Sequence, residues 1–309
     1  MLSAAQHEAV TSEAARPLQI LAGPGSGKTR VLTSRVAHLV RDSAAPIAPE
    51  RCVVVTFTNR AANEMRARLE TMIGADRTRR LVLGTFHAVC VRFLRRWGTR
   101  LGLDPRFTIA DTDDARRLLR DVDRDAPVDA TLAAISRAKA HGWTPDELRA
   151  SAQHAPGSPA HTEHLALCRT YAAYQQQLRT SHALDFDDLL LLGVRLFREH
   201  PELTTHIDHV LVDEFQDTNA VQYELLRRLS RHVSVVGDPD QSIYSWRHAD
   251  VRHIERMHLD FPGLHRVLLE ENYRSTPQIL EAALRVMQQD PHRLPKGLYT
   301  CLLYTSPSP

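Results

Sequence analysis

The sequence predicts an α/β fold, a parallel sheet with helices on both faces, together with an inserted all-helical subdomain. Three observations predict this fold. Short apolar strands recur and each is followed by a helical pattern, a glycine-rich turn joins the first strand to a helix, and one long interval shows helical patterns without a convincing strand.

Five apolar segments have the length and composition of buried strands. They cover residues 17–23, 52–57, 81–86, 209–215 and 233–238. Strands that alternate with helices form parallel sheets, which bind ligands at the carboxyl ends of their strands. Polar residues cluster at those ends in this chain, so we expect a binding site there.

Residues 98–183 interrupt the alternation of strands and helices. The segment "DTDDARRLLRDVDRD" has an amphipathic helical pattern, with Asp111 or Thr112 as its N-cap, and residues 154–161 ("HAPGSPAH") predict a loop between helices. A compact sheet does not need so much chain between residues 28 and 213, so we interpret 98–183 as a helical insertion.

Composition excludes several classes of protein. The chain has 309 residues, of which 43% are hydrophobic and 25% charged, as in ordinary globular proteins. No apolar run approaches the ~20 residues that span a bilayer, and the N-terminus lacks a signal pattern. The four cysteines are scattered, so we expect neither a disulfide framework nor a zinc site. Their pattern predicts an intracellular, reducing location.

The distribution of charge is more informative than the net charge of +2. Residues 51–100 hold eleven arginines and no lysine against only three acidic residues. Such a basic excess suits contact with a phosphate backbone. Arginine-rich helix surfaces without a partner explain it equally well.

The stretch from residue 18 to 40 predicts a nucleotide phosphate site. A strand leads through a glycine-rich turn into a helix, and backbone N–H groups of such a turn cradle anions. Lys28 can reach the β- and γ-phosphates and Thr29 can bind Mg²⁺. The strict pattern has glycine where this chain has Ala22, a harmless change if the backbone there is ordinary. The predicted nucleotide-binding residues of the turn are Ala22, Gly23, Pro24, Gly25, Ser26, Gly27, Lys28 and Thr29.

A second element completes the expected site. The apolar strand in "HVLVDEFQDTN" ends at Asp213 and Glu214. This arrangement places one carboxylate on the Mg²⁺ ion and a second near the attacking water, which makes Glu214 the candidate general base. The two elements together predict an NTPase, which could be a kinase, a transporter motor, a GTPase or a translocase.

Several motifs resemble those of superfamily 1A DNA helicases of the UvrD/PcrA/Rep type, in the expected order along about residues 2–295. They are "LSAAQHEAV", "VVVTFTNRAANEMRAR", "GTFHAVCVRFLRR", "LDFDDLL", "DEFQDTN", "VVGDPDQSIYSWR" and "LEENYRSTPQIL". Within that family, "GPGSGKT", "GDPDQ" and "EENYRS" followed by "MQQD" resemble the fungal anti-recombinase branch. "DEFQDTN" is typical of relatives that act on DNA rather than RNA.

The resemblance implies roles around the nucleotide. Gln6 would hydrogen-bond adenine, Tyr273 would stack on it, and Arg30 would lie near the base. Gln241 would sense the γ-phosphate. Arg274 would act as an arginine finger, an effect of about 10³–10⁵-fold in related chemistry.

The resemblance also implies a DNA site. Phe57, Tyr244 and Trp246 would stack on unpaired bases, at ~1–3 kcal/mol per base. Thr58, Asn59, Thr85 and His87 would contact the phosphodiester backbone, although His87 could instead cap a helix.

The expected protein is therefore an ATP- and Mg²⁺-dependent motor that steps 3′ to 5′ along single-stranded DNA and acts at single-strand/double-strand junctions. Its expected partners are repair or recombination proteins, and we expect no association with a membrane. It would work in the nucleus if fungal-like and otherwise in the bacterial cytoplasm. The alternatives are a subunit of a helicase–nuclease and a nucleotide-gated DNA-binding scaffold.

The expected domains are the first part of a RecA-like motor domain (1–97), the helical insertion (98–183), the second part of the motor domain (184–275), the start of a second motor domain (276–300) and a non-native tail (301–309). Motifs V and VI of the family are absent, so we expect a truncated chain that has little ATPase or unwinding activity alone.

Overall fold

The computed structural model describes residues 1–151, 157–230, 232–244, 249–289 and 296–302. Internal packing divides the chain into two compact units. Unit 1 comprises residues 1–86, 202–218 and 226–309, and unit 2 comprises residues 87–201 and 219–225. The domain boundaries expected from the sequence stay predictions.

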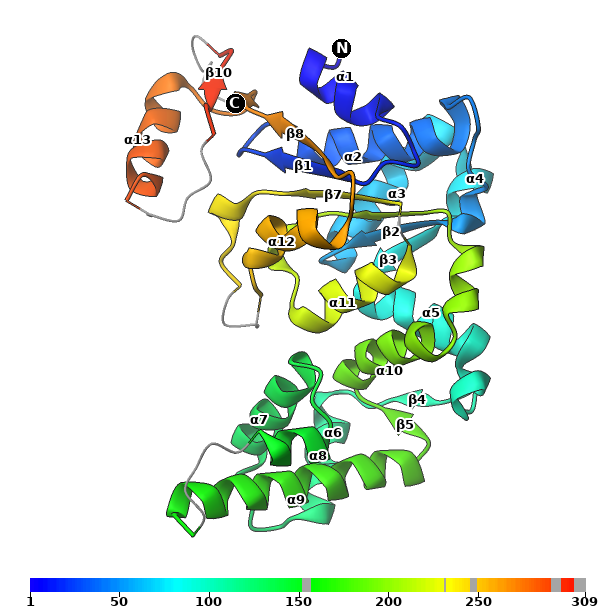
Figure 1. Cartoon of the computed structure of the whole chain (residues 1–309), viewed down its shortest axis with the longest axis vertical. Coiled ribbons are helices and arrows are strands. Elements are labelled where there is room, and N and C mark those ends of the chain that lie inside the picture. Colours follow the sequence, from blue (N-terminus) through cyan, green and yellow to red (C-terminus); the bar gives the residue numbers. More distant parts are fainter. Residues whose placement is uncertain (152–156, 231, 245–248, 290–295, 303–309) are drawn as a thin grey trace. The chain divides into compact units, whose positions relative to one another are not determined.

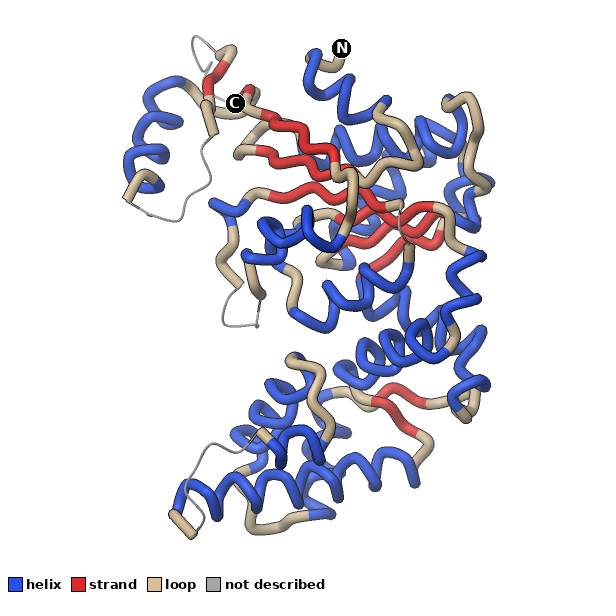
Figure 2. The backbone as a smooth tube through the Cα atoms, viewed as in Figure 1, coloured by secondary structure: helices blue, strands red, loops and turns tan. Residues whose placement is uncertain are grey.

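A six-stranded parallel sheet forms the centre of unit 1 (Figures 1 and 2). Its order is β3 (Val82–Thr85), β2 (Cys52–Thr56), β6 (His209–Val212), β7 (Val233–Gly237), β1 (Leu18–Ala22) and β8 (His265–Leu269). All pairings are parallel, so every strand ends at the same edge of the sheet. This confirms the predicted parallel α/β fold and its five strands.

Strand β8 was missed by the sequence analysis. It lies at the sheet edge beside β1, and its residues alternate between exposed and buried instead of forming a continuous apolar run. A strand that is covered on only part of its surface lacks the apolar signal of a central parallel strand.

Side-chain alternation along β1 explains how helices cover both faces of the sheet. Leu18 and Ile20 belong to the apolar core that contains Leu32 of α2 (Lys28–Ala37). Gln19 points to the other face, where its amide donates to the Ile254 carbonyl of α12 (Arg252–Asp260) at 2.7 Å. The sheet is therefore buried between two helical layers (Figure 1).

The remaining elements of unit 1 connect or flank these strands. They are α1 (Ala4–Thr11), η1 (His38–Asp42), η2 (Pro49–Arg51), α3 (Asn59–Ile73), α4 (Ala75–Arg80), η5 (Phe215–Asp217), η6 (Pro239–Gln241), β9 (Glu271–Asn272), α13 (Pro277–Met287) and β10 (Tyr299–Thr300). Strands β9 and β10 form a separate two-stranded parallel sheet.

Unit 2 is mainly helical. It contains η3 (Gly98–Leu101), β4 (Thr108–Ile109), α6 (Thr112–Val122), α7 (Val128–Ala140), α8 (Pro145–Ala150), α9 (Pro159–Thr180), β5 (Ala183–Leu184), α10 (Phe186–Glu199) and nearly all of α5 (Phe86–Trp97). Two elements lie across the division between the units, η4 (Pro201–His206) and α11 (Ala220–Leu229).

The structure refines the predicted helical interval in three places. Asp111, and not Thr112, caps α6, and its carboxylate accepts from the amides of Asp113 and Asp114. Strands β4 and β5 pair over two residues each, too short for a periodic signal. Part of the predicted loop 154–161 lies outside the described residues, and its last residues already belong to α9.

Lys139 is the electrostatic centre of unit 2. Its side chain is fully buried, and its ammonium contacts Asp185 at 2.6 Å and Asp188 at 2.7 Å. Asp185 also caps α10, so the ion cluster connects α7 to the start of α10.

Among the described residues no helix is both long and apolar enough to cross a bilayer.

Candidate nucleotide and nucleic-acid site

The glycine-rich turn lies between β1 and α2, as predicted. Ala22 is the last residue of β1 and has ordinary strand geometry, so its difference from the strict pattern is harmless. Gly25 and Gly27 have φ values of 66° and 86°, a conformation that residues with a Cβ rarely adopt. No side chain caps the start of α2, so its first N–H groups are available to an anion.

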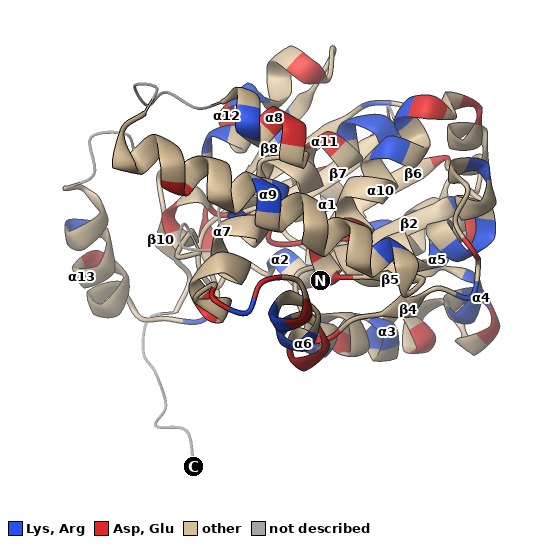
Figure 3. Ribbon diagram, turned by 90° about the horizontal axis from the view of Figure 1, so that it is seen from below, with Lys and Arg blue, Asp and Glu red and all other residues tan. Residues whose placement is uncertain are grey.

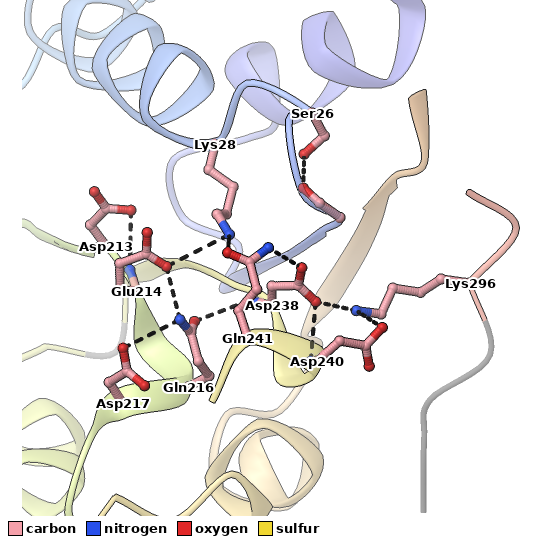
Figure 4. Close-up of polar contacts among 11 residues, drawn as sticks. Ser26, Lys28, Asp213, Glu214, Gln216, Asp217, Asp238, Asp240, Gln241 and Lys296 are labelled. Atoms are coloured by element: carbon pink, nitrogen blue, oxygen red, sulfur yellow. Dashed lines mark hydrogen bonds and ion pairs between the residues drawn. The ribbon is translucent and has the colours of Figure 1, made fainter. Parts of the chain in front are cut away.

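Lys28 is the meeting point of three chain segments (Figure 4). Its ammonium donates to Gln241 Oε1 at 3.0 Å and lies 3.7 Å from Glu214 Oε2. The lysine comes from the turn after β1, the glutamate follows β6 and the glutamine follows β7. Three residues that the sequence analysis assigned to phosphate chemistry are therefore close enough to share one ligand.

Glu214 has a backbone conformation that marks a specialised position. Its φ of 48° and ψ of 47° are left-handed, which costs a non-glycine residue on the order of 1–3 kcal/mol. This conformation turns the chain sharply after β6 and places the carboxylate beside Lys28.

Gln216 and Asp238 hold this group together, although the sequence analysis did not single them out. The Gln216 amide donates to Glu214 Oε2 at 2.8 Å, and its carbonyl oxygen accepts from the Asp238 amide nitrogen at 3.0 Å. Gln241 Nε2 donates to Asp238 Oδ2. The sequence feature that could have identified Gln216 and Asp238 is their position in "DEFQD" and "GDPDQ". These segments directly follow two strands that are neighbours in the sheet.

Asp213 is a buried carboxylate that suits a cation. Burial, aided by the negative charge of Glu214, raises the pKa of Asp213 to about 7. A bound cation would stabilise its charged form. Thr29, on the first turn of α2, supplies a hydroxyl, and carboxylate and hydroxyl oxygens are ligands that Mg²⁺ accepts. The residues present fit the ion.

Gln6 contacts the glycine-rich turn directly. Its Nε2 donates to the Ser26 carbonyl at 2.9 Å, and its Oε1 accepts from the Ser3 amide at 3.0 Å as part of the capping box of α1. One N–H and one lone pair of its amide stay available for an adenine edge.

The other residues predicted near the base lie on the surface. Arg30 is exposed and donates to the Met1 carbonyl at 3.1 Å. Tyr273 is 40% exposed, and its hydroxyl donates to Glu271 at 2.5 Å. The Tyr273 amide donates to the Gly25 carbonyl at 3.0 Å, so its backbone is fixed to the turn.

Arg274 lies against the same turn. A Cβ added to Gly25 would be 2.7 Å from the Cβ of Arg274, so glycine is required for this approach. Buried Asn272, another residue that the sequence analysis missed, donates to the Pro24 carbonyl at 2.7 Å and accepts from the Arg274 amide at 2.8 Å. These contacts hold exposed Arg274 at the rim of the glycine-rich turn.

The structure brings two of the three predicted base-stacking residues together. The rings of Phe57 and Tyr244 are stacked, with centroids 5.6 Å apart and planes inclined by 27°. Phe57 follows β2 and Tyr244 follows β7. Trp246 lies outside the described residues.

The residues predicted to contact the DNA backbone are divided between the units. Thr58 caps α3, where its hydroxyl accepts from the Ala61 amide at 3.1 Å, and Asn59 is the exposed first residue of that helix. Thr85 ends β3 in unit 1. His87 belongs to unit 2, where its ring contacts the edge of Phe186 and burial lowers its pKa.

The basic excess of residues 51–100 is partly neutralised by acidic residues from elsewhere in the chain. Arg51 pairs with Asp208, and Arg80 pairs with Glu50 at 2.8 Å. Both blue and red residues lie on α3 and α4 in Figure 3. The four arginines after residue 86 belong to unit 2, so the charge count does not describe one continuous surface.

Comparisons with known proteins agree with this geometry. Residues 2–262 match the family described as UvrD/REP helicase N-terminal domain. The chain is 42% identical over 298 residues to the ATP-dependent DNA helicase PcrA of Leuconostoc citreum, an alignment that covers 92% of the chain and 39% of the relative. It is 40% identical to the PcrA proteins of Staphylococcus epidermidis and Staphylococcus aureus, over 97% and 96% of the chain and 41% of each relative.

The chain thus spans about two fifths of the length of the curated relatives it matches. These relatives are bacterial, and neither the fungal branch nor the nuclear location considered from the sequence is supported.

Proposed function

Because the chain belongs to the UvrD/REP helicase family, we propose that it forms the ATP-binding part of a motor that moves 3′ to 5′ along single-stranded DNA. One observation carries the proposal: Lys28 lies 3.0 Å from Gln241 and 3.7 Å from Glu214. These residues follow three neighbouring strands that end at the same edge of the sheet, and together they form a polar group that suits a phosphate.

The proposed roles follow from chemistry at these positions. Lys28 and the free N–H groups of α2 bind the phosphates. Glu214 is the only carboxylate of the group that contacts Lys28, and it orients and deprotonates the attacking water. Arg274 neutralises charge on the transferred phosphoryl group.

Asp213 and Thr29 would hold Mg²⁺. The ion would supply positive charge against the β- and γ-phosphate oxygens. Gln6 would read adenine with the N–H and lone pair that its internal contacts leave available, and Tyr273 would stack on the base.

Coupling to DNA is proposed to run through the segment that follows β7. Gln241 contacts Lys28. Three residues later in the chain, the ring of Tyr244 stacks on Phe57. A change at Gln241 on arrival of the γ-phosphate would therefore shift the Tyr244 ring, and exposed bases could stack there. DNA junctions and repair or recombination proteins stay proposed partners.

Nucleotide titration of the chain tests the first step. The Lys28→Ala variant should bind a fluorescent ATP analogue at least about tenfold more weakly than the wild-type chain, because it loses a charge-assisted contact. Arg285→Ala, which removes an exposed ion pair with Glu281, is the matched control. Equal affinities of Lys28→Ala and wild type would refute the nucleotide site.

Hydrolysis separates the motor from a nucleotide-gated scaffold. Glu214→Gln should retain ATP binding and lose any ATPase activity stimulated by poly-dT. A scaffold would keep its DNA affinity and its response to ATP in that variant. Stimulation by poly-U equal to that by poly-dT would contradict the assignment to DNA.

A further inference from the structure

The chain contains only three lysines among its 39 basic residues Lys and Arg: Lys28, Lys139 and Lys296. All three side chains are nearly buried, with exposed fractions of 11%, 0% and 1%, and each ammonium contacts carboxylate groups. The phosphate turn explains Lys28, and the core of unit 2 explains Lys139. Lys296 has no role in the functions described above.

Lys296 pairs with two aspartates that lie shortly before Gln241, the proposed γ-phosphate sensor, in the chain (Figure 4). Its ammonium donates to Asp238 Oδ1 and lies 3.3 Å from Asp240 Oδ2. Asp238 is completely buried, and a buried carboxylate is stable in its charged form only with such a cation.

The other oxygen of Asp238 determines the orientation of the Gln241 amide. Gln241 Nε2 donates to Asp238 Oδ2, which leaves Gln241 Oε1 facing the ammonium of Lys28. A charged carboxylate only accepts hydrogen bonds, so the amide nitrogen must face it.

Lys296 lies on a short strap, residues 296–302, that is fixed beside the phosphate turn. Within the strap, the Tyr299 amide donates to the Glu270 carbonyl at 3.1 Å and the Thr300 hydroxyl donates to the Asn272 carbonyl at 3.0 Å. The side chain of Leu298 lies directly against Gly23 and occupies the space that a Cβ there would need. The strap therefore contacts the turn before Lys28 and the segment after β7 at once.

We propose that Lys296 is a positioning residue for recognition of the γ-phosphate. It holds one carboxylate oxygen of Asp238, the other oxygen of Asp238 fixes the amide of Gln241, and Gln241 is thereby set against Lys28. The inference rests on the proposed function, since it requires ATP at Lys28. Because Lys296 would act through Asp238 and Gln241, its loss should weaken discrimination between ATP and ADP rather than nucleotide binding in general.

Calorimetric titration with ADP and with the non-hydrolysable β,γ-imido analogue of ATP, both with Mg²⁺, tests the proposal. The wild-type chain should prefer the ATP analogue. Lys296→Met should reduce that preference about fivefold or more, the lower end of the usual range for coupled sites, with ADP affinity changed less than about twofold. Lys296→Gln, which keeps one donor for Asp238, should give an intermediate preference.

Lys139→Gln is the matched control because it also removes a buried lysine from two aspartates, in unit 2. It should lower thermal stability and keep the wild-type preference. If no nucleotide binds to the wild-type chain, the proposed nucleotide site fails. If the wild type binds both nucleotides and folded Lys296→Met or Lys296→Gln shows the wild-type preference, the inference about Lys296 is wrong and the proposed function stands.

Discussion

Phe57 and Tyr244 are 187 residues apart in the chain, yet their rings stack at 5.6 Å. The sheet order explains this contact, because β6 alone separates β2 from β7 and all three strands end at the same edge. The same edge carries Lys28, which begins the helix after β1, the strand directly beside β7. One parallel sheet thus places both the Phe57–Tyr244 ring pair and Lys28.

Replacement of Tyr244 by alanine should weaken binding of oligo-dT by about 5- to 150-fold, because a base stacked on an aromatic ring is stabilised by ~1–3 kcal/mol. Fluorescence anisotropy with a labelled oligonucleotide measures this. Tyr244→Phe keeps the ring and should bind like the wild-type chain. Equal affinities of the alanine and phenylalanine variants would show that the ring does not contact bases.

Gly25→Ala should abolish nucleotide binding. The added Cβ would meet Arg274 at 2.7 Å, and the left-handed backbone costs about 1–2 kcal/mol for any residue other than glycine. Gly102→Ala is a matched control, since its φ of 76° is also left-handed but no atom lies within 4 Å of an added Cβ. Both variants should lose similar thermal stability from the backbone. Nucleotide affinity should fall only for Gly25→Ala, and an unchanged affinity there would contradict the assigned turn geometry.

The stability of unit 2 should decrease as pH rises from about 4 to 6. Burial, aided by the charge of Asp185, raises the pKa of Asp187 from 3.8 to about 6. Within that window the unfolded chain releases a proton that the folded chain retains, so the free energy of unfolding falls by roughly 1–3 kcal/mol and then levels off.

Asp187→Asn should remove this decrease and be more stable than the wild type at pH 7. Urea unfolding at pH 4.5 and at pH 7 measures the difference. Asp121→Asn, an exposed position on α6, should keep the wild-type dependence. If the free energy of unfolding of Asp187→Asn falls with pH as it does in the wild type, the role of Asp187 is refuted.

Arg35→Met should destabilise unit 1 by about 3 kcal/mol, because the fully buried guanidinium donates to the carbonyls of Ala9 and Ser12 at 3.1 and 2.9 Å and to Ser234 Oγ at 2.7 Å. Chemical denaturation gives the value. Exposed Arg16, which donates to one carbonyl, is the control, and Arg16→Met should change stability by less than about 0.5 kcal/mol. A similarly small change in Arg35→Met would mean that the helix α1 does not depend on this arginine.

The sequence predicted the parts of the fold that have a local signal. Continuous apolar runs identified the buried parallel strands, and the residues directly after them identified Lys28, Glu214 and Gln241, which the structure brings together. Their catalytic roles, like those of Arg274 and the DNA-contacting residues, stay predictions.

The missed features depend on contacts between distant segments. Lys296 meets Asp238 across 58 residues, and Asn272 meets Pro24 across 248. No periodicity records such pairs. Strand β8 alternates between exposed and buried residues and therefore lacks a continuous apolar run, and β4 and β5, at two residues each, are too short for a periodic signal.

The engagement of every lysine has a practical consequence. The three lysines are the only side-chain amines of residues 1–309, and each is nearly buried against a carboxylate. Reagents that couple to lysine should therefore label the folded chain slowly. Partial unfolding would expose these ammonium groups, so lysine labelling would report the loss of folded structure.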